Sequence, residues 1–343
     1  MADWRLLKRL CTARGISGQE DEVRSLILKE ITPLADRIEI SPLGNILAFK
    51  AGEKPANCKL MLAAHMDEVG MIVTQITEDG LLKFSPVGGI DRRVLPGKSV
   101  LVGKNIPGVI GAKPIHLLEK DEREKSVPVK DLSIDIGALS EKEALESVKP
   151  GDAVTFDSVF DVSRGTVKAK ALDDRAGCAL LIQLMKTGLK HDAWFAFTVQ
   201  EEIGFSGAKT ASWNLEPDAA IVLESTTAAD VPGVDKERQV CRLGEGPVIS
   251  FMDRRTIYDR KLVDLAFETA KNIGVKCQVK QAVAGGNDAG AIHVSRGGVR
   301  TVAVSLPCRY LHSAAGVIAQ EDFLGARKLV AELADRITGA EQA

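Results

Sequence analysis

Histidines and carboxylates follow the apolar segments of this sequence. Four apolar runs each lead into such residues: 59–64 into His65, 193–199 into Glu201 and Glu202, 219–223 into Glu224, and 300–306 into the segment that carries His312. If these runs are buried strands of an open α/β sheet, the residues that follow them gather at its carboxyl edge, where such sheets place ligand sites. Asp173, at the start of a predicted helix, is the natural fifth member.

Histidine and carboxylate side chains in this combination are typical of a site for two divalent cations of the zinc class. A shared carboxylate bridges the metals in such sites, which lie roughly 3.5–4 Å apart. Residues two apart in an extended segment face the same way, so Asp67 is predicted to reach the His65 imidazole and fix its tautomer. Adjacent residues point oppositely, so only one of Glu201 and Glu202 is predicted to bind metal, while the other acts as general base.

The elements that position these residues follow an α/β pattern. Strands alternate with helices at both ends of the chain, which predicts a mainly parallel sheet with helices on both faces. Residues 70–163 differ, because they are rich in short β-like runs and glycine or proline turns. We therefore expect a discontinuous catalytic domain, 1–69 and 164–343, interrupted by a small β-rich domain, 70–163. Ser17 and Glu20 have the spacing of a capping box that opens a helix ending near Pro33.

Composition excludes several classes of protein. The 45 basic and 47 acidic residues give a net charge of -2, which argues against a nucleic-acid-binding protein. The first residues lack the uninterrupted apolar core of a signal peptide, and the longest apolar stretches are too short to span a membrane. The six cysteines lie far apart without a framework spacing, as expected of reduced thiols. We expect a cytoplasmic protein.

Six blocks of the sequence resemble the cellulase-M/TET family of dinuclear metallo-aminopeptidases, in the family's order. They are AHMDEVG (64–70), KALDDRAG (170–177), QEEIGFSGA (200–208), LESTTAADVPG (223–233), AGGNDAGAIH (284–293) and RYLHS (309–313). The resemblance covers essentially the whole chain. It implies a phosphorylase/hydrolase-like zinc peptidase fold with an inserted, small β-barrel-like dimerisation domain, peptide substrates, and self-association into dimers and tetrahedral dodecamers.

The resemblance also implies roles for individual residues. One metal would be held by His65, Asp173 and Glu224, and the other by Asp173, Glu202 and His312, with Asp173 as the bridge. Glu201 would be the general base and Asp67 the partner of His65. The bond between Asp173 and Asp174 would be cis. Zinc or cobalt is the expected metal, and manganese is an alternative that such ligands accept.

The sequence departs from the family at two positions. Glu224 stands where aspartate is more frequent, which leaves Asp230 as an alternative ligand, and Asn287 stands where the family usually has threonine. His116, in the inserted domain, is a candidate to approach the site of a neighbouring subunit.

Three rival functions are weighed against the aminopeptidase. A related dinuclear amidohydrolase, such as a deacetylase or a carboxypeptidase-like enzyme, is the alternative, followed by a non-catalytic assembly protein that kept the fold. The endoglucanase label of some relatives has little support, because 3 Trp and 2 Tyr do not form a carbohydrate-stacking array.

Overall fold

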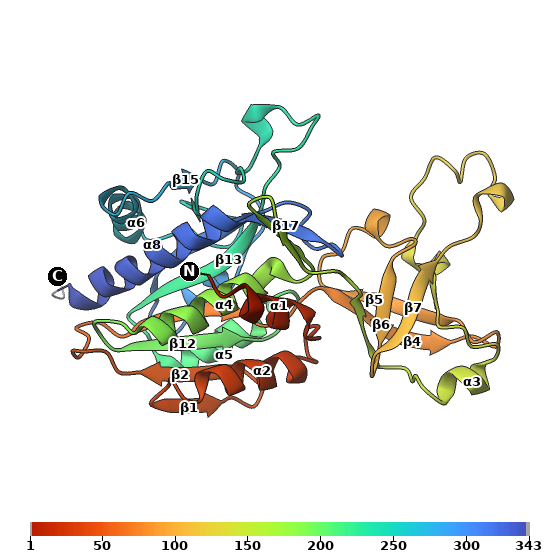
Figure 1. Cartoon of the computed structure of the whole chain (residues 1–343), viewed down its shortest axis with the longest axis horizontal. Helices are drawn as coiled ribbons and strands as arrows, with labels where there is room; N and C mark the ends of the chain where they lie inside the picture. The colour runs from red at the N-terminus through yellow and green to blue at the C-terminus, as the bar shows by residue number, and fades with distance from the viewer. Residues whose placement is uncertain (1, 341–343) are drawn as a thin grey trace.

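The computed structural model describes residues 2–340 and is built on an eight-stranded sheet (Figure 1). Its strands lie in the order β1 (Arg37–Ile40), β2 (Ile46–Lys50), β12 (Ala193–Thr198), β3 (Leu60–His65), β13 (Ala219–Thr227), β16 (Arg300–Cys308), β14 (Val248–Ile249) and β15 (Gln278–Val279). The four central strands β12, β3, β13 and β16 run parallel, whereas β1, β2 and β14 pair antiparallel to their inner neighbours. The predicted α/β fold class is confirmed.

Helices cover both faces of this sheet. On one face, α4 (Leu172–Thr187) contacts β3 and β13 and packs beside α1 (Trp4–Thr12), α2 (Asp21–Ile31) and α8 (Gln320–Gly339). On the other face, α5 (Ser206–Leu215) packs on β12 and β3, next to the short α7 (Ala289–Ile292). A further helix, α6 (Arg260–Asn272), lies beside α8. Because both faces are covered, β3 is buried along its whole length, which explains its continuous apolar sequence.

The inserted segment forms a closed barrel with its own core. Its strands lie in the order β4 (Gly70–Ile76), β5 (Leu82–Val87), β8 (Ser133–Asp135), β7 (Ile106–Gly111), β6 (Ser99–Val102) and β9 (Ala153–Phe156). The barrel stands apart from the sheet in Figure 1. A short helix, α3 (Glu141–Leu145), and three 3₁₀ turns, η1 (Arg92–Val94), η2 (Ile115–Leu117) and η3 (Val129–Asp131), accompany it.

A small three-stranded sheet follows the barrel strands along the chain. In it, β11 (Thr166–Ala169) pairs with β10 (Asp161–Ser163) on one side and with β17 (Gly316–Ala319) on the other. The expected limit of the insertion at residue 163 falls in the turn between β10 and β11.

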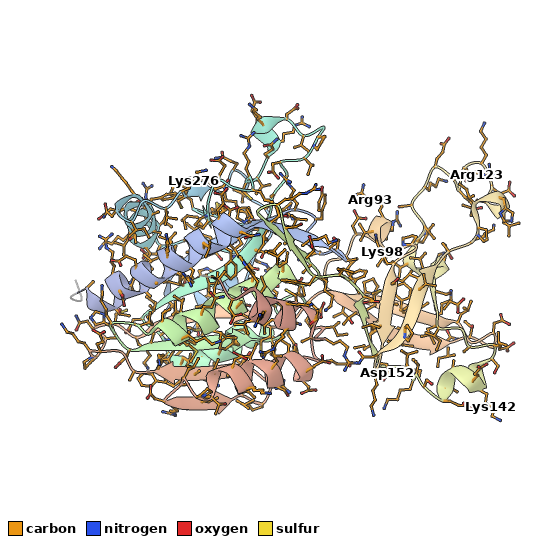
Figure 2. The ribbon with its side chains drawn as sticks, in the orientation of Figure 1. Arg93, Lys98, Arg123, Lys142, Asp152 and Lys276 are labelled. Carbon is orange, nitrogen blue, oxygen red and sulfur yellow. The ribbon has the colours of Figure 1, made fainter. Side chains whose placement is uncertain are left out.

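The charged stretch 119–130 lies in a loop of the barrel, and Figure 2 shows Arg123 at its tip, pointing away from the protein.

The structure differs from the sequence-based expectations in three places. Helix α2 begins at Asp21, and the Glu20 side chain makes no capping bond, so the predicted capping box is wrong. Strand β13 continues to Thr227, which places Glu224 inside the strand instead of after it. Helix α5 and the 3₁₀ turn η4 (Lys236–Arg238) were not predicted.

Within residues 2–340, no helix has both the length and the apolar character that a membrane crossing requires.

The central strand gives a direct test of this architecture. Leu62 lies in the middle of β3 and is fully buried, so Leu62→Ala leaves a cavity under the sheet. We expect the free energy of unfolding to fall by about 2–5 kcal/mol, measured by urea denaturation followed by circular dichroism. Leu139→Ala, at a side chain that is 86% exposed, is the control and should change it by no more than about 0.5 kcal/mol. Equal effects of the two substitutions would contradict the assignment of β3 to the core.

Candidate metal centre

The predicted site residues gather at the carboxyl edge of the sheet. His65 is the last residue of β3, Glu201 and Glu202 follow β12, and Glu224 lies in β13. Asp173 begins α4 and His312 lies beyond the end of β16. Since four of these elements are adjacent parallel strands, their carboxyl ends open on the same side of the sheet.

Asp173 lies between the two histidines. Its Oδ1 is 3.3 Å from Nε2 of His65, and its Oδ2 is 3.2 Å from Nε2 of His312. Each oxygen of one carboxylate thus faces a different imidazole. The peptide bond from Asp173 to Asp174 is cis, as the resemblance implied.

A glutamate also faces the Nε2 atom of each histidine that Asp173 contacts. Glu224 Oε1 lies 3.5 Å from His65 Nε2, and Glu202 Oε2 lies 3.4 Å from His312 Nε2. Glu201 Oε2 is farther away, 4.0 Å from His65 Nε2. Both neighbouring glutamates therefore face the same cluster. The strand alternation that would separate them does not apply, because β12 ends at Thr198 and Gln200 has a φ of 57°.

The other nitrogen of each imidazole is held by a backbone carbonyl. His65 Nδ1 lies 3.1 Å from the carbonyl of Asp67, and His312 Nδ1 lies 3.0 Å from the carbonyl of Gly89. A carbonyl only accepts, so Nδ1 carries a proton in both rings and Nε2 is the nitrogen that faces the cluster. This is the arrangement that metal-binding histidines usually show.

The Asp67 carboxylate organises the segment behind the cluster. Its Oδ1 accepts the N–H of Glu201 at 3.0 Å and lies 3.4 Å from His65 Nδ1, while its Oδ2 accepts the N–H of Glu202 at 3.2 Å. Ser17 Oγ donates to the same Oδ2 at 2.6 Å. Asp67 thus fixes both the imidazole and the turn that carries the two glutamates. Ser17, which the sequence assigned to a helix cap, belongs to this network instead.

Burial and mutual repulsion shift the acidities of the clustered groups. Burial raises the pKa of Glu202 to about 7, although the charge of His312 opposes the change. Burial also raises the pKa of Glu201 and of Glu224 well above the usual value, and the charge of Asp173 raises both further. Burial alone would lower the pKa of His312, but its hydrogen bond with Asp173 and the charge of Glu202 raise it to about 9. The cluster thus holds more negative charge than its own histidines compensate.

The donor set fits divalent cations. Glu202 Oε1 and Glu224 Oε2 are buried oxygens without a hydrogen-bond donor among the described residues. Ligand atoms of His65, Asp173 and Glu202, and likewise of Asp173, Asp174 and Glu224, lie within 4.8 Å of one another. One oxygen of Asp174 is already engaged, because its Oδ1 accepts the N–H of Gly177 at 3.0 Å and so caps the helix. Imidazole and carboxylate donors around one bridging carboxylate suit metals of the zinc class.

Comparison with known proteins identifies the family. The family described as M42 glutamyl aminopeptidase matches residues 44–329. The chain belongs to the M42 peptidase family. It is a metal-dependent aminopeptidase, as the six sequence blocks predicted. The description of the matched family names none of the three rivals.

Relatives of M42 type match the chain over nearly its whole length. A lysyl aminopeptidase of Pyrococcus furiosus is 34% identical over 91% of this chain and 91% of its own, and a glutamyl aminopeptidase of Lactococcus lactis is 32% identical over 94% and 92%. Among solved structures, a TET aminopeptidase from a marine sediment Thaumarchaeota archaeon has a TM-score of 0.93 at 36% identity, covering 97% of this chain and 96% of its own. The TET1 peptidase of Pyrococcus horikoshii has a TM-score of 0.84 at 38% identity, covering 96% and 98%.

The alternative ligand Asp230 is engaged elsewhere in this M42 chain. Arg309 donates to both of its oxygens, from Nε to Oδ1 and from an Nη to Oδ2, each at 2.7 Å. The N–H of Leu243 donates to Oδ2 as well. Glu224, in contrast, reaches the cluster and keeps a free oxygen. The geometry therefore favours Glu224 over Asp230 as the candidate metal ligand.

The remaining candidates lie apart from the cluster. Asn287 lines the cavity above it, and its Nδ2 donates to the Tyr258 hydroxyl at 3.1 Å. His293 Nδ1 lies 2.8 Å from the Ala289 carbonyl of α7. His116 is exposed in the 3₁₀ turn η2 of the barrel, so an approach to a neighbouring subunit stays a prediction.

A buried ion-pair group behind the centre was missed from the sequence. Lys170 Nζ contacts both oxygens of Glu68 at 2.7 Å. Arg175, which is fully buried, donates to the carbonyls of Leu10, Ala13, Gly15 and Met66. The group ties the N-terminal segment to the turn that contains Asp67. Its signal was present, because charged residues interrupt the apolar and glycine-rich blocks 64–70 and 170–177.

The bond between Ser17 and Asp67 can be tested by removing the donor. Ser17→Ala leaves a buried carboxylate with one hydrogen bond fewer, and we expect the free energy of unfolding to fall by about 1–3 kcal/mol in urea denaturation. Ser25→Ala, on the exposed side of α2, is the matched control and should have almost no effect. If the two variants unfold at the same urea concentration, Ser17 has no role in the network.

Proposed function

We propose that the cluster binds two divalent cations that share Asp173. The observation that carries this proposal is the orientation of its carboxylate, with one oxygen toward His65 and the other toward His312. Glu224 would complete the first site and Glu202 the second. Zinc or cobalt fits these donors, and manganese is also accepted by such ligands.

The cations would supply a Lewis acid for the scissile carbonyl and a water molecule of lowered pKa. We propose Glu201 as the general base that takes a proton from this water and passes it to the leaving amine. Three features support the role: Glu201 lies just outside the contacts made by the other five groups, its side chain is buried, and its pKa is raised by that burial. A raised pKa makes a carboxylate a stronger base. Asp67 would orient both His65 and the Glu201 backbone.

Peptides are the proposed substrates. A cavity of about 1070 Å³ opens above the cluster and is lined by Asp173, Glu201, Glu202, Glu224 and His312 on its floor. Such a volume accommodates the first residues of an extended peptide. No nucleic-acid or membrane partner is expected.

Self-association is proposed from two observations. Apolar side chains of the barrel region are exposed, with Ile115 at 70% and Leu117 at 56% in the turn η2, which is typical of a surface that another subunit covers. The related TET1 peptidase of Pyrococcus horikoshii assembles into a tetrahedron or a large octahedral shell. We propose that the barrel, within the division 70–163, mediates dimerisation and that dimers form tetrahedral dodecamers. A cytoplasmic location fits the six cysteines, all of them free thiols.

Replacement of the proposed base tests the mechanism. We expect Glu201→Gln to lower kcat on aminoacyl p-nitroanilides by about 10²–10⁴-fold while retaining two metal ions per chain by elemental analysis, because the amide cannot accept the proton. Asp173→Asn should lose metal as well as activity. The wild-type enzyme should be inactivated by a chelator, reactivated by zinc or cobalt, and inactive on N-acetylated substrates. A Glu201→Gln variant with wild-type rates would refute the proposed role.

The choice between Glu224 and Asp230 is tested by metal content. We expect Glu224→Gln to bind close to one metal ion per chain and to lose most activity, because one site loses an anionic ligand. Asp230→Asn should retain two, since its partner is Arg309. The opposite result, with metal lost only in Asp230→Asn, would transfer the ligand role to Asp230.

A further inference from the structure

Side chains hold the backbone of the turn 199–202, which carries two glutamates of the cluster. Four consecutive N–H groups of this turn each donate to a side-chain oxygen. In chain order, the acceptors are Asn45 Oδ1 at 3.1 Å, Glu20 Oε1 at 3.3 Å, Asp67 Oδ1 at 3.0 Å and Asp67 Oδ2 at 3.2 Å. All three acceptor side chains are buried and come from the N-terminal part of the chain. The conformation of the turn therefore depends on contacts with residues that are distant in the sequence.

Glu20 is the acceptor at the second position of this turn, and its side chain is almost completely buried. It precedes α2, but its carboxylate makes no capping bond with that helix. Its Oε1 accepts the N–H of Gly18 at 2.7 Å and the N–H of Gln200 at 3.3 Å. One carboxylate oxygen thus joins the N-terminal segment to the turn of the cluster.

A carboxylate in this position is costly. Burial raises the pKa of Glu20, the hydrogen bond from Gly18 opposes the change, and the charge of Asp67 adds to it. Two buried carboxylates beside the same turn repel each other, and each needs hydrogen-bond donors to remain charged. The N–H groups of the turn are such donors for both side chains.

Gln200 has a backbone conformation that needs support. Its φ of 57° is uncommon for a residue other than glycine and persists where the surrounding contacts demand it. Glu20 holds its N–H, and its carbonyl accepts the N–H of Ser206, the first residue of α5, at 3.4 Å. Glu201 follows directly in the chain. The direction of the Glu201 side chain therefore depends on how Gln200 is held.

The segment that carries Glu20 is itself fixed at both ends. At its start, the Gly15 carbonyl accepts the N–H of Glu68 at 2.9 Å and a bond from the buried Arg175 at 3.3 Å. At its end, the Glu20 carbonyl accepts the N–H of Arg24 at 2.9 Å in the first turn of α2. The carboxylate of Glu20 is thus presented to the turn by an ordered part of the fold.

We propose that Glu20 is a positioning residue for the reaction, which holds Gln200 so that the carboxylate of Glu201 is aimed at the water it deprotonates. The inference rests on the proposed function, because Glu201 is the base proposed there. Glu20 lies outside the cavity above the cluster, so it acts through the turn and not on the substrate. A displacement of about 1 Å in a catalytic group can lower a rate by about 10²-fold. The N–H of Glu202 is held by Asp67, so the metal ligand depends less on Glu20.

The test removes the acceptor and then restores it. Glu20→Ala removes both hydrogen bonds, whereas Glu20→Gln keeps an oxygen at the same reach. Glu20→Asp keeps the charge but is one methylene shorter, and it tests the same point if Glu20→Ala does not fold. For each full-length variant, kcat and KM are measured on the aminoacyl p-nitroanilide that the wild type cleaves fastest, and metal content is measured by elemental analysis.

Asp322→Ala is the matched control. Asp322 is also a buried carboxylate at the start of a helix, and it accepts two backbone N–H groups, those of Gly244 and Gly246, each at 2.8 Å. It lies outside the cavity above the cluster. Its removal therefore shows what the loss of such a carboxylate does to stability alone, which urea denaturation measures for all variants.

We expect Glu20→Ala and Glu20→Asp to lower kcat by about 10–100-fold, with KM nearly unchanged and two metal ions per chain retained. Glu20→Gln and Asp322→Ala should keep a kcat close to that of the wild type. In a Glu201→Gln background, Glu20→Ala should lower the residual rate no further, because the effects of residues that act as a unit are not additive.

Several outcomes would overturn the inference and leave the aminopeptidase proposal intact. They are a wild-type kcat in Glu20→Ala, equal losses of kcat in Glu20→Ala and Glu20→Gln, an equal loss in Asp322→Ala, loss of metal from Glu20→Ala, and a further loss of rate in the Glu201→Gln background. A wild-type kcat in Glu201→Gln itself would instead contradict the proposed base, and that variant is measured on its own.

Discussion

The crowding of buried carboxylates at the carboxyl edge of the sheet is the constraint on which the rest of this structure depends. Asp67, Asp173, Glu201, Glu202 and Glu224 lie together with only two histidines to offset their charge. Like charges at such distances in a poorly solvated site repel strongly, and burial raises the pKa of Glu201, Glu202 and Glu224. Bound divalent cations would offset this repulsion. The arrangement of these carboxylates and the proposed binding of metal therefore depend on each other.

Much of the surrounding architecture serves to hold these groups in place. The Asp67 carboxylate accepts three hydrogen bonds, and the Lys170–Glu68 pair with Arg175 fixes the turn behind it. The inserted barrel contributes as well, because the Gly89 carbonyl before η1 orients His312. A segment of the barrel therefore orients a proposed ligand, and the cluster is complete only when barrel and sheet are placed correctly.

The loops around the cluster adopt unusual backbone conformations. Positive φ values occur at Ala171, Gln200, Tyr310 and His312, which are not glycine. Such conformations are sparsely populated and persist where the surrounding contacts demand them. Here they turn the chain sharply after β12 and β16 and before α4, so that side chains on adjacent residues face one hollow. The cavity above is lined by residues from distant parts of the chain, which no local sequence motif encodes.

The sequence by itself determined the fold class, the parallel core strands and the identity of the cluster. Continuous apolar runs predicted the strands, and the residues directly after them predicted the sheet edge that carries the metal-binding side chains. Both signals could be read from the sequence because they are local. Helix α5, the continuation of β13 past Glu224 and the true role of Ser17 were not predictable. They depend on contacts between residues far apart in the chain, such as Ser17 with Asp67. Only the tertiary structure showed that Arg309 forms an ion pair with Asp230, because the pairing of charges is a property of packing.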